Sequence, residues 1–86
     1  MKEMSVIFRD PKEVQEFVAI VAKYPCNMDM KRGMFIIDAK SILGILGLGT
    51  GQVMKLQIQE DDCRELVDDI QRFCLSPCSE FLYNQS

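Results

Sequence analysis

The sequence of 86 residues contains no histidine and no apolar run long enough to cross a membrane. Its ten lysine and arginine residues are scattered along the chain, and thirteen acidic residues outnumber them. Without a basic stripe, the chain is not expected to have a nucleic acid as its main ligand. The segment from Met1 to Met4 lacks the apolar core of a signal peptide, so we expect a cytoplasmic protein. Length and composition predict a single small domain over residues 1–86.

Four cysteines are present, but their pattern indicates neither a disulfide framework nor a metal site. Three residues separate Cys74 from Cys78, unlike the closer spacing of a zinc motif, and no histidine completes a set of ligands. Cys63 and Cys74 fall on an apolar helical face, and Cys26 falls on the apolar side of an alternating segment. We therefore interpret the cysteines as small buried hydrophobic residues and expect no bound metal or cofactor.

The hydrophobic pattern predicts the order strand, helix, strand, strand, helix, strand, helix. Strands are expected over residues 2–8, 26–31, 34–38 and 54–59, with a tight turn at Arg32-Gly33. Helices are expected over residues 10–23, 41–48 and 62–74. Asp10 and Glu13 form a capping box at the start of the first helix, and Asp62 and Glu65 form one at the start of the third. This order predicts an α+β, two-layer domain with helices on one face of a largely antiparallel sheet. Its core spans residues 2–74, and residues 75–86 form a C-terminal tail.

The segment from Asp38 to Leu48 is the most informative part of the chain. Ser41 stands where a helix would begin, and the residues at 42, 43, 45, 46 and 48 are apolar. These positions cover more than one helical face, so one-sided packing cannot bury them all, and an exposed apolar patch usually meets a partner. Lys40 and the helix start would favour a phosphate on Ser41. Two interpretations stay open: a docking patch with a switch at its edge, or a capped and buried helix.

Residues Ala39 to Leu48 read Ala-Lys-Ser-Ile-Leu-Gly-Ile-Leu-Gly-Leu. This segment resembles the regulatory segment of HPr, the histidine-containing phosphocarrier of the bacterial sugar phosphotransferase system, in which Lys-Ser-Ile-Met-Gly is usual. The stretch from Phe17 to Tyr24 resembles the end of the first helix of that family, and the spacing from Phe17 to Ser41 matches without a gap. The resemblance covers residues 2–74. It implies an open-faced sandwich with a four-stranded antiparallel sheet in the order 1-4-2-3.

One departure from the family is large. HPr proteins carry a phosphate on a histidine at the start of the first helix, where this chain has Asp10, and Lys12 stands at the position of a family arginine. Without an imidazole, we predict neither histidine phosphocarrier activity nor an enzyme. Asp10 is interpreted mainly as a helix cap, although a carboxylate can also accept a phosphoryl group. Lys12 is interpreted as a solvated side chain, with anion binding as the alternative.

The resemblance also implies regulation at Ser41. It implies phosphorylation by HPr kinase/phosphorylase and docking to a transcriptional regulator of carbon catabolism in bacteria. Ile42, Leu43 and Leu46 resemble the family's partner-facing patch, with burial as the alternative. The hypothesis is a regulatory, protein-binding module in which Ser41, next to Lys40, is the switch. The alternatives are a degenerate carrier phosphorylated at Asp10 and a structural interaction domain, and we expect a monomer or a weak dimer formed through the tail, residues 78–83.

Overall fold

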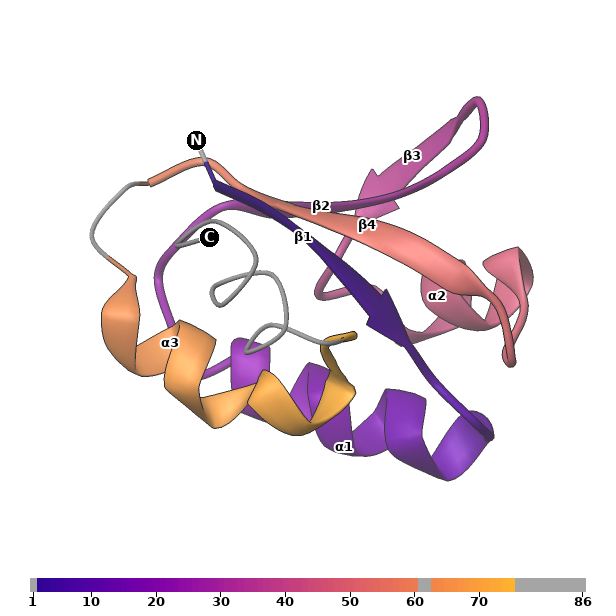
Figure 1. The fold of residues 1–86 in the computed structure, drawn as a ribbon, viewed down its shortest axis with the longest axis horizontal. Helices are drawn as coiled ribbons and strands as arrows, with labels where there is room; N and C mark the ends of the chain where they lie inside the picture. Colours follow the sequence, from indigo (N-terminus) through magenta and orange to yellow (C-terminus); the bar gives the residue numbers. More distant parts are fainter. Residues whose placement is uncertain (1, 61–62, 76–86) are drawn as a thin grey trace, which may run out of the picture.

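The computed structural model describes residues 2–60 and 63–75, and in this part of the chain a sheet and a layer of helices pack face to face (Figure 1). The sheet is formed by β1 (Lys2–Ile7), β2 (Met28–Arg32), β3 (Phe35–Asp38) and β4 (Val53–Ile58). The helices are α1 (Pro11–Val21), α2 (Ile42–Leu48) and α3 (Arg64–Asp69), followed by a short 3₁₀ helix (Gln71–Phe73). All the strand pairs are antiparallel, and the order is β1-β4-β2-β3, so the predicted α+β fold and its strand order are confirmed. None of the described helices is long and apolar enough to cross a membrane.

One face of the sheet carries most of the core. Because side chains alternate along a strand, β4 buries Met54, Leu56 and Ile58 and exposes Val53 and Lys55. The neighbouring strands keep the same register, with Val6 of β1 opposite Met54 and Met30 of β2 opposite Leu56. The buried side chains of these strands therefore line up on the face that the helices cover.

Three phenylalanines form the centre of the interface between the helices and the sheet. Phe8 follows β1, Phe17 lies on the buried side of α1, and Phe73 ends the 3₁₀ helix. Their ring centroids are 5.0 Å apart for Phe8 and Phe17, 5.6 Å for Phe8 and Phe73, and 5.5 Å for Phe17 and Phe73. Edge-on and tilted pairs at these distances are favourable beyond the area that they bury. The cluster connects three segments that are far apart in the sequence.

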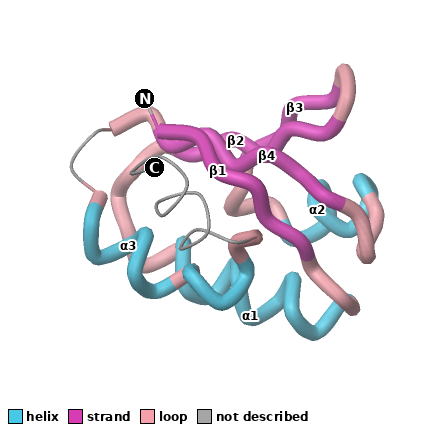
Figure 2. Tube along the Cα trace, viewed as in Figure 1, coloured by secondary structure: helices cyan, strands magenta, loops and turns pink. Residues whose placement is uncertain are grey.

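The third predicted helix is shorter than expected. The helical pattern predicts one helix over residues 62–74, but α3 ends at Asp69, and Figure 2 shows a break before the helical turn that follows. Beyond the break, Cys74 pairs with Val6, and the backbone N–H of Leu75 donates to the carbonyl oxygen of Ser5 at 2.9 Å. The chain has to turn toward the edge of β1 to make these bonds, and a continuous helix would not do so. Ile70 and Phe73 are buried nevertheless, so the predicted apolar stripe survives the break.

Smaller differences affect the ends of elements. The backbone of α1 leaves the helix after Val21, two residues before the predicted end, and the hairpin turns at Gly33 and Met34 instead of Arg32-Gly33. Gly33 has a φ of 60°, a conformation that glycine adopts without a steric penalty. The predicted capping residue Asp62 and the tail after Leu75 lie outside the described residues.

Tyr24 connects the end of α1 to α3. Its hydroxyl donates a hydrogen bond to Oδ2 of Asp69. That bond, then partial burial, and then the negative charge of Asp69 raise the pKa of Tyr24 from 10.0 to about 12. Because the pKa is higher in the folded than in the unfolded chain, the stabilisation by this bond is complete below pH 10.0 and is lost as the pH rises toward 12.

A titration of phenolate absorbance tests this contact. We expect one tyrosine to ionise with a pKa of about 12 and Tyr24→Phe to remove that phase, which separates it from the second tyrosine of the sequence. Asp69→Ala is expected to return the pKa of Tyr24 toward its ordinary value, whereas Asp68→Ala, one residue earlier, is expected to change it little. A Tyr24 pKa that does not respond to Asp69→Ala would contradict the contact.

Candidate functional site

The start of α1 holds the residue that replaces the histidine of the resembled family. Asp10 has extended backbone angles, and its Oδ1 accepts a hydrogen bond of 2.9 Å from the backbone N–H of Glu13. In return, Oε1 of Glu13 accepts a bond of 2.8 Å from the backbone N–H of Arg9. The first bond confirms the predicted cap at Asp10. In the second bond, Glu13 contacts the residue before the cap and not the N–H of Asp10, which a capping box would use. The carboxylate of Asp10 is therefore used by the helix itself.

Lys12 lies in the first turn of α1 with an exposed side chain. Within the described ranges, no hydrogen bond or ion pair connects Lys12 to another side chain. This position fits the solvated interpretation of Lys12, and nothing in the geometry brings it toward Asp10.

Asp10→Ala is expected to lower the unfolding free energy by about 1 kcal/mol because the N–H of Glu13 loses its side-chain acceptor. In a domain of this size, that loss corresponds to a melting temperature lower by roughly 4–8 °C. Lys12→Ala is the matched control in the same turn and is expected to change stability by less than about 0.5 kcal/mol. Equal effects of the two variants in urea denaturation would argue against the cap.

The start of α2 is the second candidate region. Ser41 has φ −94° and ψ 104°, and its Oγ accepts a hydrogen bond of 3.2 Å from the backbone N–H of Gly44. The backbone N–H of Ser41 donates to the carbonyl oxygen of Asp38 at 3.0 Å. The predicted role of Ser41 as an N-cap is therefore confirmed, and its side chain is exposed to solvent.

Close packing around position 44 explains why the third residue after Ser41 is a glycine. A Cβ atom at this position would lie 2.8 Å from Cδ1 of Ile37 in β3 and 3.0 Å from Oγ of Ser41. The missing side chain therefore lets α2 approach the edge of the sheet while the serine keeps its capping bond. This close packing fixes the position of Ser41 relative to β3.

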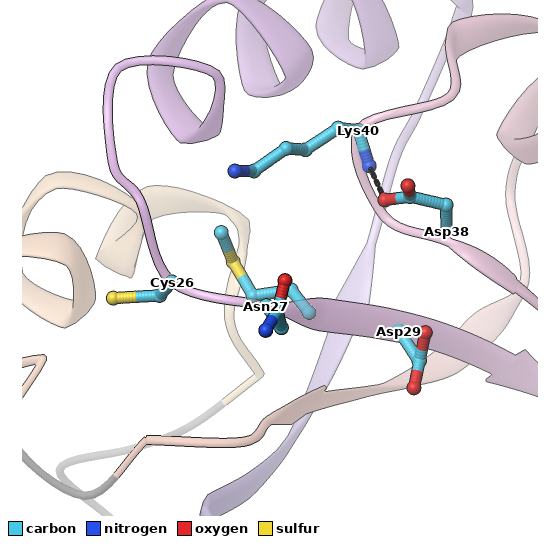
Figure 3. Close-up of a pocket in the computed structure, with 6 residues that line it drawn as sticks. Cys26, Asn27, Asp29, Asp38 and Lys40 are labelled. Carbon is cyan, nitrogen blue, oxygen red and sulfur yellow. Dashed lines mark hydrogen bonds between the residues drawn. The ribbon is translucent and has the colours of Figure 1, made fainter.

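Lys40 is held by its own contacts. Its backbone N–H donates to Oδ1 of Asp38 at 2.9 Å, and its Nζ donates to the carbonyl oxygen of Tyr24 at 2.7 Å. Figure 3 shows the side chain extending away from Asp38, over a pocket of about 340 Å³ that Cys26, Asn27 and Asp38 help to line. The ammonium group of Lys40 thus caps the chain after α1, and the structure does not direct it to the hydroxyl of Ser41.

The apolar residues of α2 divide between core and surface. Ile45 and Leu48 are buried, Ile42 and Leu46 are half-buried and pack against the core, and Leu43 is 78% exposed. The predicted cap is thus confirmed and the predicted burial holds for part of the helix, whereas the docking patch stays a prediction. Of the three residues predicted to contact a partner, Leu43 is the one that projects into solvent.

Sequence reasoning missed a larger exposed apolar surface on the β2–β3 hairpin. Met34 is 96% exposed, Phe35 69% and Ile36 58%, whereas Ile37 is half-buried under α2. The signal in the sequence was the run of four successive apolar residues. A strand that is covered on one face cannot bury such a run, because alternate side chains point to opposite faces.

The two candidate regions lie at opposite ends of α1. The bond from Lys40 to Tyr24 ties the start of α2 to the end of α1. At the other end, the backbone N–H of Gly51, beyond α2, donates to the carbonyl oxygen of Phe8, before α1, at 2.6 Å. Asp10 therefore lies on the far side of a helix that, at 11 residues, is about 16 Å long. The predicted site residues form two separate regions.

Comparison with known proteins decides the family. The family model described as "PTS HPr component phosphorylation site" matches residues 12–75, which is most of the chain. The chain belongs to the HPr family. HPr proteins are phosphocarriers and not themselves enzymes, and they act by interacting with other proteins of the phosphotransferase system. A search of curated protein sequences gave no match.

Solved structures of HPr proteins share the fold. HPr-C-His from Thermoanaerobacter tengcongensis is 26% identical, with a TM-score of 0.70 over 84% of this chain and 89% of that chain. The phosphocarrier protein HPr from Bacillus anthracis is 18% identical, with a TM-score of 0.67 over 86% of this chain and 96% of that chain. A histidine-containing phosphocarrier protein from a mycoplasma is 17% identical, with a TM-score of 0.67 over 83% and 89% of the two chains. The last two likenesses concern the fold alone.

Proposed function

We propose that this HPr-family chain is a cytoplasmic regulatory, protein-binding module and not a histidine phosphocarrier. The observation that carries the proposal is chemical: the sequence contains no histidine, and the Asp10 carboxylate caps α1. A neutral imidazole is the group that accepts and releases a phosphoryl group readily near pH 7, and none of the 86 residues supplies one. The remaining family feature that can carry a phosphate is the serine at the start of α2.

Ser41 is the proposed phosphorylation site. Its side chain is exposed, so a kinase can reach the hydroxyl without opening the core. The Oγ atom accepts one bond, from the N–H of Gly44, and a phosphate ester keeps that oxygen in place. Lys40 would have to leave the carbonyl oxygen of Tyr24 to reach the phosphate, and the carboxylate of Asp38 opposes the added charge. The phosphate is therefore expected to act mainly as a charge presented to a partner.

Leu43 is the proposed centre of the partner-binding surface, with the half-buried Ile42 and Leu46 at its edges. An exposed leucine two residues after a modifiable serine combines an apolar contact with a switchable charge. Such a surface fits a protein partner that reads both features, which in this family is a regulator of carbon catabolism, and the modifying enzyme is an HPr kinase/phosphorylase.

The alternative carrier role at Asp10 has less support. Its Oδ1 holds the N–H of Glu13, and the carboxylate of Glu13 adds a second negative charge bonded to the N–H of Arg9. Both features oppose the approach of an anionic phosphoryl donor. A structural interaction domain is the other alternative, and it predicts no phosphate at either position.

Two phosphoryl donors used in parallel test the proposal. With ATP and HPr kinase/phosphorylase, we expect the intact mass to show one added phosphate. With phosphoenolpyruvate and the first enzyme of the phosphotransferase system, we expect none. A histidine-containing HPr is the positive control for both reactions. A hydroxylamine-sensitive phosphate from phosphoenolpyruvate would instead support an acyl phosphate at Asp10, and no phosphate from an active kinase would contradict the switch at Ser41.

A further inference from the structure

Two cysteines lie in unusually close contact at the end of the domain opposite the start of α1. The Sγ atoms of Cys26 and Cys63 are 2.7 Å apart, although 37 positions separate the two residues in the sequence. Cys26 belongs to the connection between α1 and β2, and Cys63 is the N-cap residue of α3. Both are buried, with exposed fractions of 9% and 5%. Their positions in the sequence predict small buried hydrophobic residues, and membership of the HPr family gives them no role.

The distance between the two sulfur atoms can be compared with the distances in a disulfide bond and in a zinc site. A disulfide bond is about 2.05 Å long, so the sulfurs need to approach by a fraction of an ångström. Two thiolates on one tetrahedral zinc ion, each about 2.3 Å from the metal, would stand roughly 3.8 Å apart, so the present contact would have to open by a larger distance.

A third metal-ligand candidate is nearby but occupied. The Glu60 carboxylate lies within 4.8 Å of both sulfurs, yet its Oε2 accepts a hydrogen bond of 2.9 Å from the backbone N–H of Asn27. That bond orients the carboxylate toward the backbone of the strand connection. The three groups therefore favour a bond between the sulfurs over the binding of a metal ion.

We propose that Cys26 and Cys63 are a dithiol–disulfide pair that is oxidised by a small-molecule disulfide such as oxidised glutathione. The Cys26 thiolate attacks one sulfur of glutathione disulfide, and a glutathione thiolate leaves. The Cys63 thiolate then attacks the Cys26 sulfur of the mixed disulfide and displaces the second glutathione. The protein loses two protons and two electrons, and one glutathione disulfide becomes two glutathione thiols. Excess reduced glutathione drives the same steps backward.

The surroundings of the two cysteines leave access for a small disulfide and show which segments the new bond would join. A surface cavity of about 230 Å³ is lined by both cysteines together with Pro25 and Arg64, so a small disulfide has an approach from solvent. Figure 3 shows the sulfur of Cys26 pointing away from Lys40 and its pocket. Cys63 stands at the N-cap position of α3, so a disulfide at this residue would join the start of α3 covalently to the segment that follows α1.

Peptide mapping of the full chain tests the proposal directly. The native protein, first reduced and then treated with oxidised glutathione, is alkylated and digested with trypsin. Cleavage after lysine and arginine places Cys26 in the peptide 24–31, Cys63 in the peptide 56–64, and both other cysteines in the peptide 73–86. We expect a link between peptides 24–31 and 56–64 and an intact mass lower by two hydrogen atoms. Cys26→Ser should abolish this link, and the matched control Cys74→Ser should retain it.

A second measurement shows whether the link forms in the folded domain. We expect the melting temperature to be higher in the oxidised than in the reduced protein by an amount on the order of 10 °C, with no such shift in Cys26→Ser. A link from either peptide to 73–86, a stable glutathione adduct without a link, or a lower melting temperature after oxidation would overturn the proposal. One zinc ion per reduced chain that blocks the oxidation and is lost in Glu60→Gln would overturn it in favour of a metal site.

Discussion

Phe17→Ala is expected to lower the unfolding free energy by about 3–5 kcal/mol. Phe17 is fully buried and contacts both Phe8 and Phe73, with ring centroids 5.0 Å and 5.5 Å away. Removing its ring leaves a cavity between α1, the end of β1 and the 3₁₀ helix, which the neighbouring rings can fill only in part. Since a domain is typically stable by 5–15 kcal/mol, the variant is expected to be close to its unfolding threshold. Urea denaturation followed by circular dichroism measures the effect.

Phe35→Ala is the matched control for that loss. The same side chain is removed, but Phe35 is 69% exposed at the tip of the β2–β3 hairpin. We expect a change within about 0.5 kcal/mol, because little apolar area returns to water. Comparable losses in the two variants would contradict the position of Phe17 at the centre of the core.

Ser41→Ala is expected to abolish the phosphate that ATP and HPr kinase/phosphorylase add to the chain. The reason is the loss of the hydroxyl, but alanine also removes a capping bond, which costs about 1 kcal/mol. Ser41→Asn separates the two effects, because asparagine caps a helix as well as serine and offers no hydroxyl. Both variants should stay unphosphorylated, and only Ser41→Ala should be measurably less stable. Intact mass and thermal melting report the two outcomes.

Thr50→Ala is the control for this prediction, since Thr50 offers a hydroxyl just beyond the other end of α2. This variant is expected to accept one phosphate like the parent chain. Phosphate that persists in Ser41→Asn would place the modification elsewhere and would remove the link between the phosphate and Leu43.

The start of α1 is an example of a local structure that can be predicted from the sequence alone. Asp10, Pro11 and Glu13 determine a helix start through bonds that span only a few residues, so the pattern predicts them well. The sheet order is different, because pairing between β1 and β4 joins residues about fifty positions apart. Here that order came from the resemblance to HPr, and the structure confirms it.

The errors in the prediction come from contacts that periodicity does not encode. The single helix predicted over residues 62–74 breaks because Cys74 and Leu75 bond to the edge of β1. The short distance between the sulfur atoms of Cys26 and Cys63 likewise depends on the fold, because 37 positions separate the two residues along the chain. At the candidate site, the helix cap at Ser41 was predictable, but the bond from Lys40 to Tyr24 was not.

The bond from Lys40 to Tyr24 has a thermodynamic consequence. The ammonium group of Lys40 donates to the carbonyl oxygen of Tyr24, three residues beyond the end of α1, and it belongs to the residue before the proposed phosphorylation site. If an anion draws Lys40 away from Tyr24, its binding free energy must offset the loss of that bond. A stronger bond between Lys40 and Tyr24 therefore lowers the affinity for the anion by the same free energy. The order of the chain after α1 and the affinity for charge at α2 are therefore coupled reciprocally.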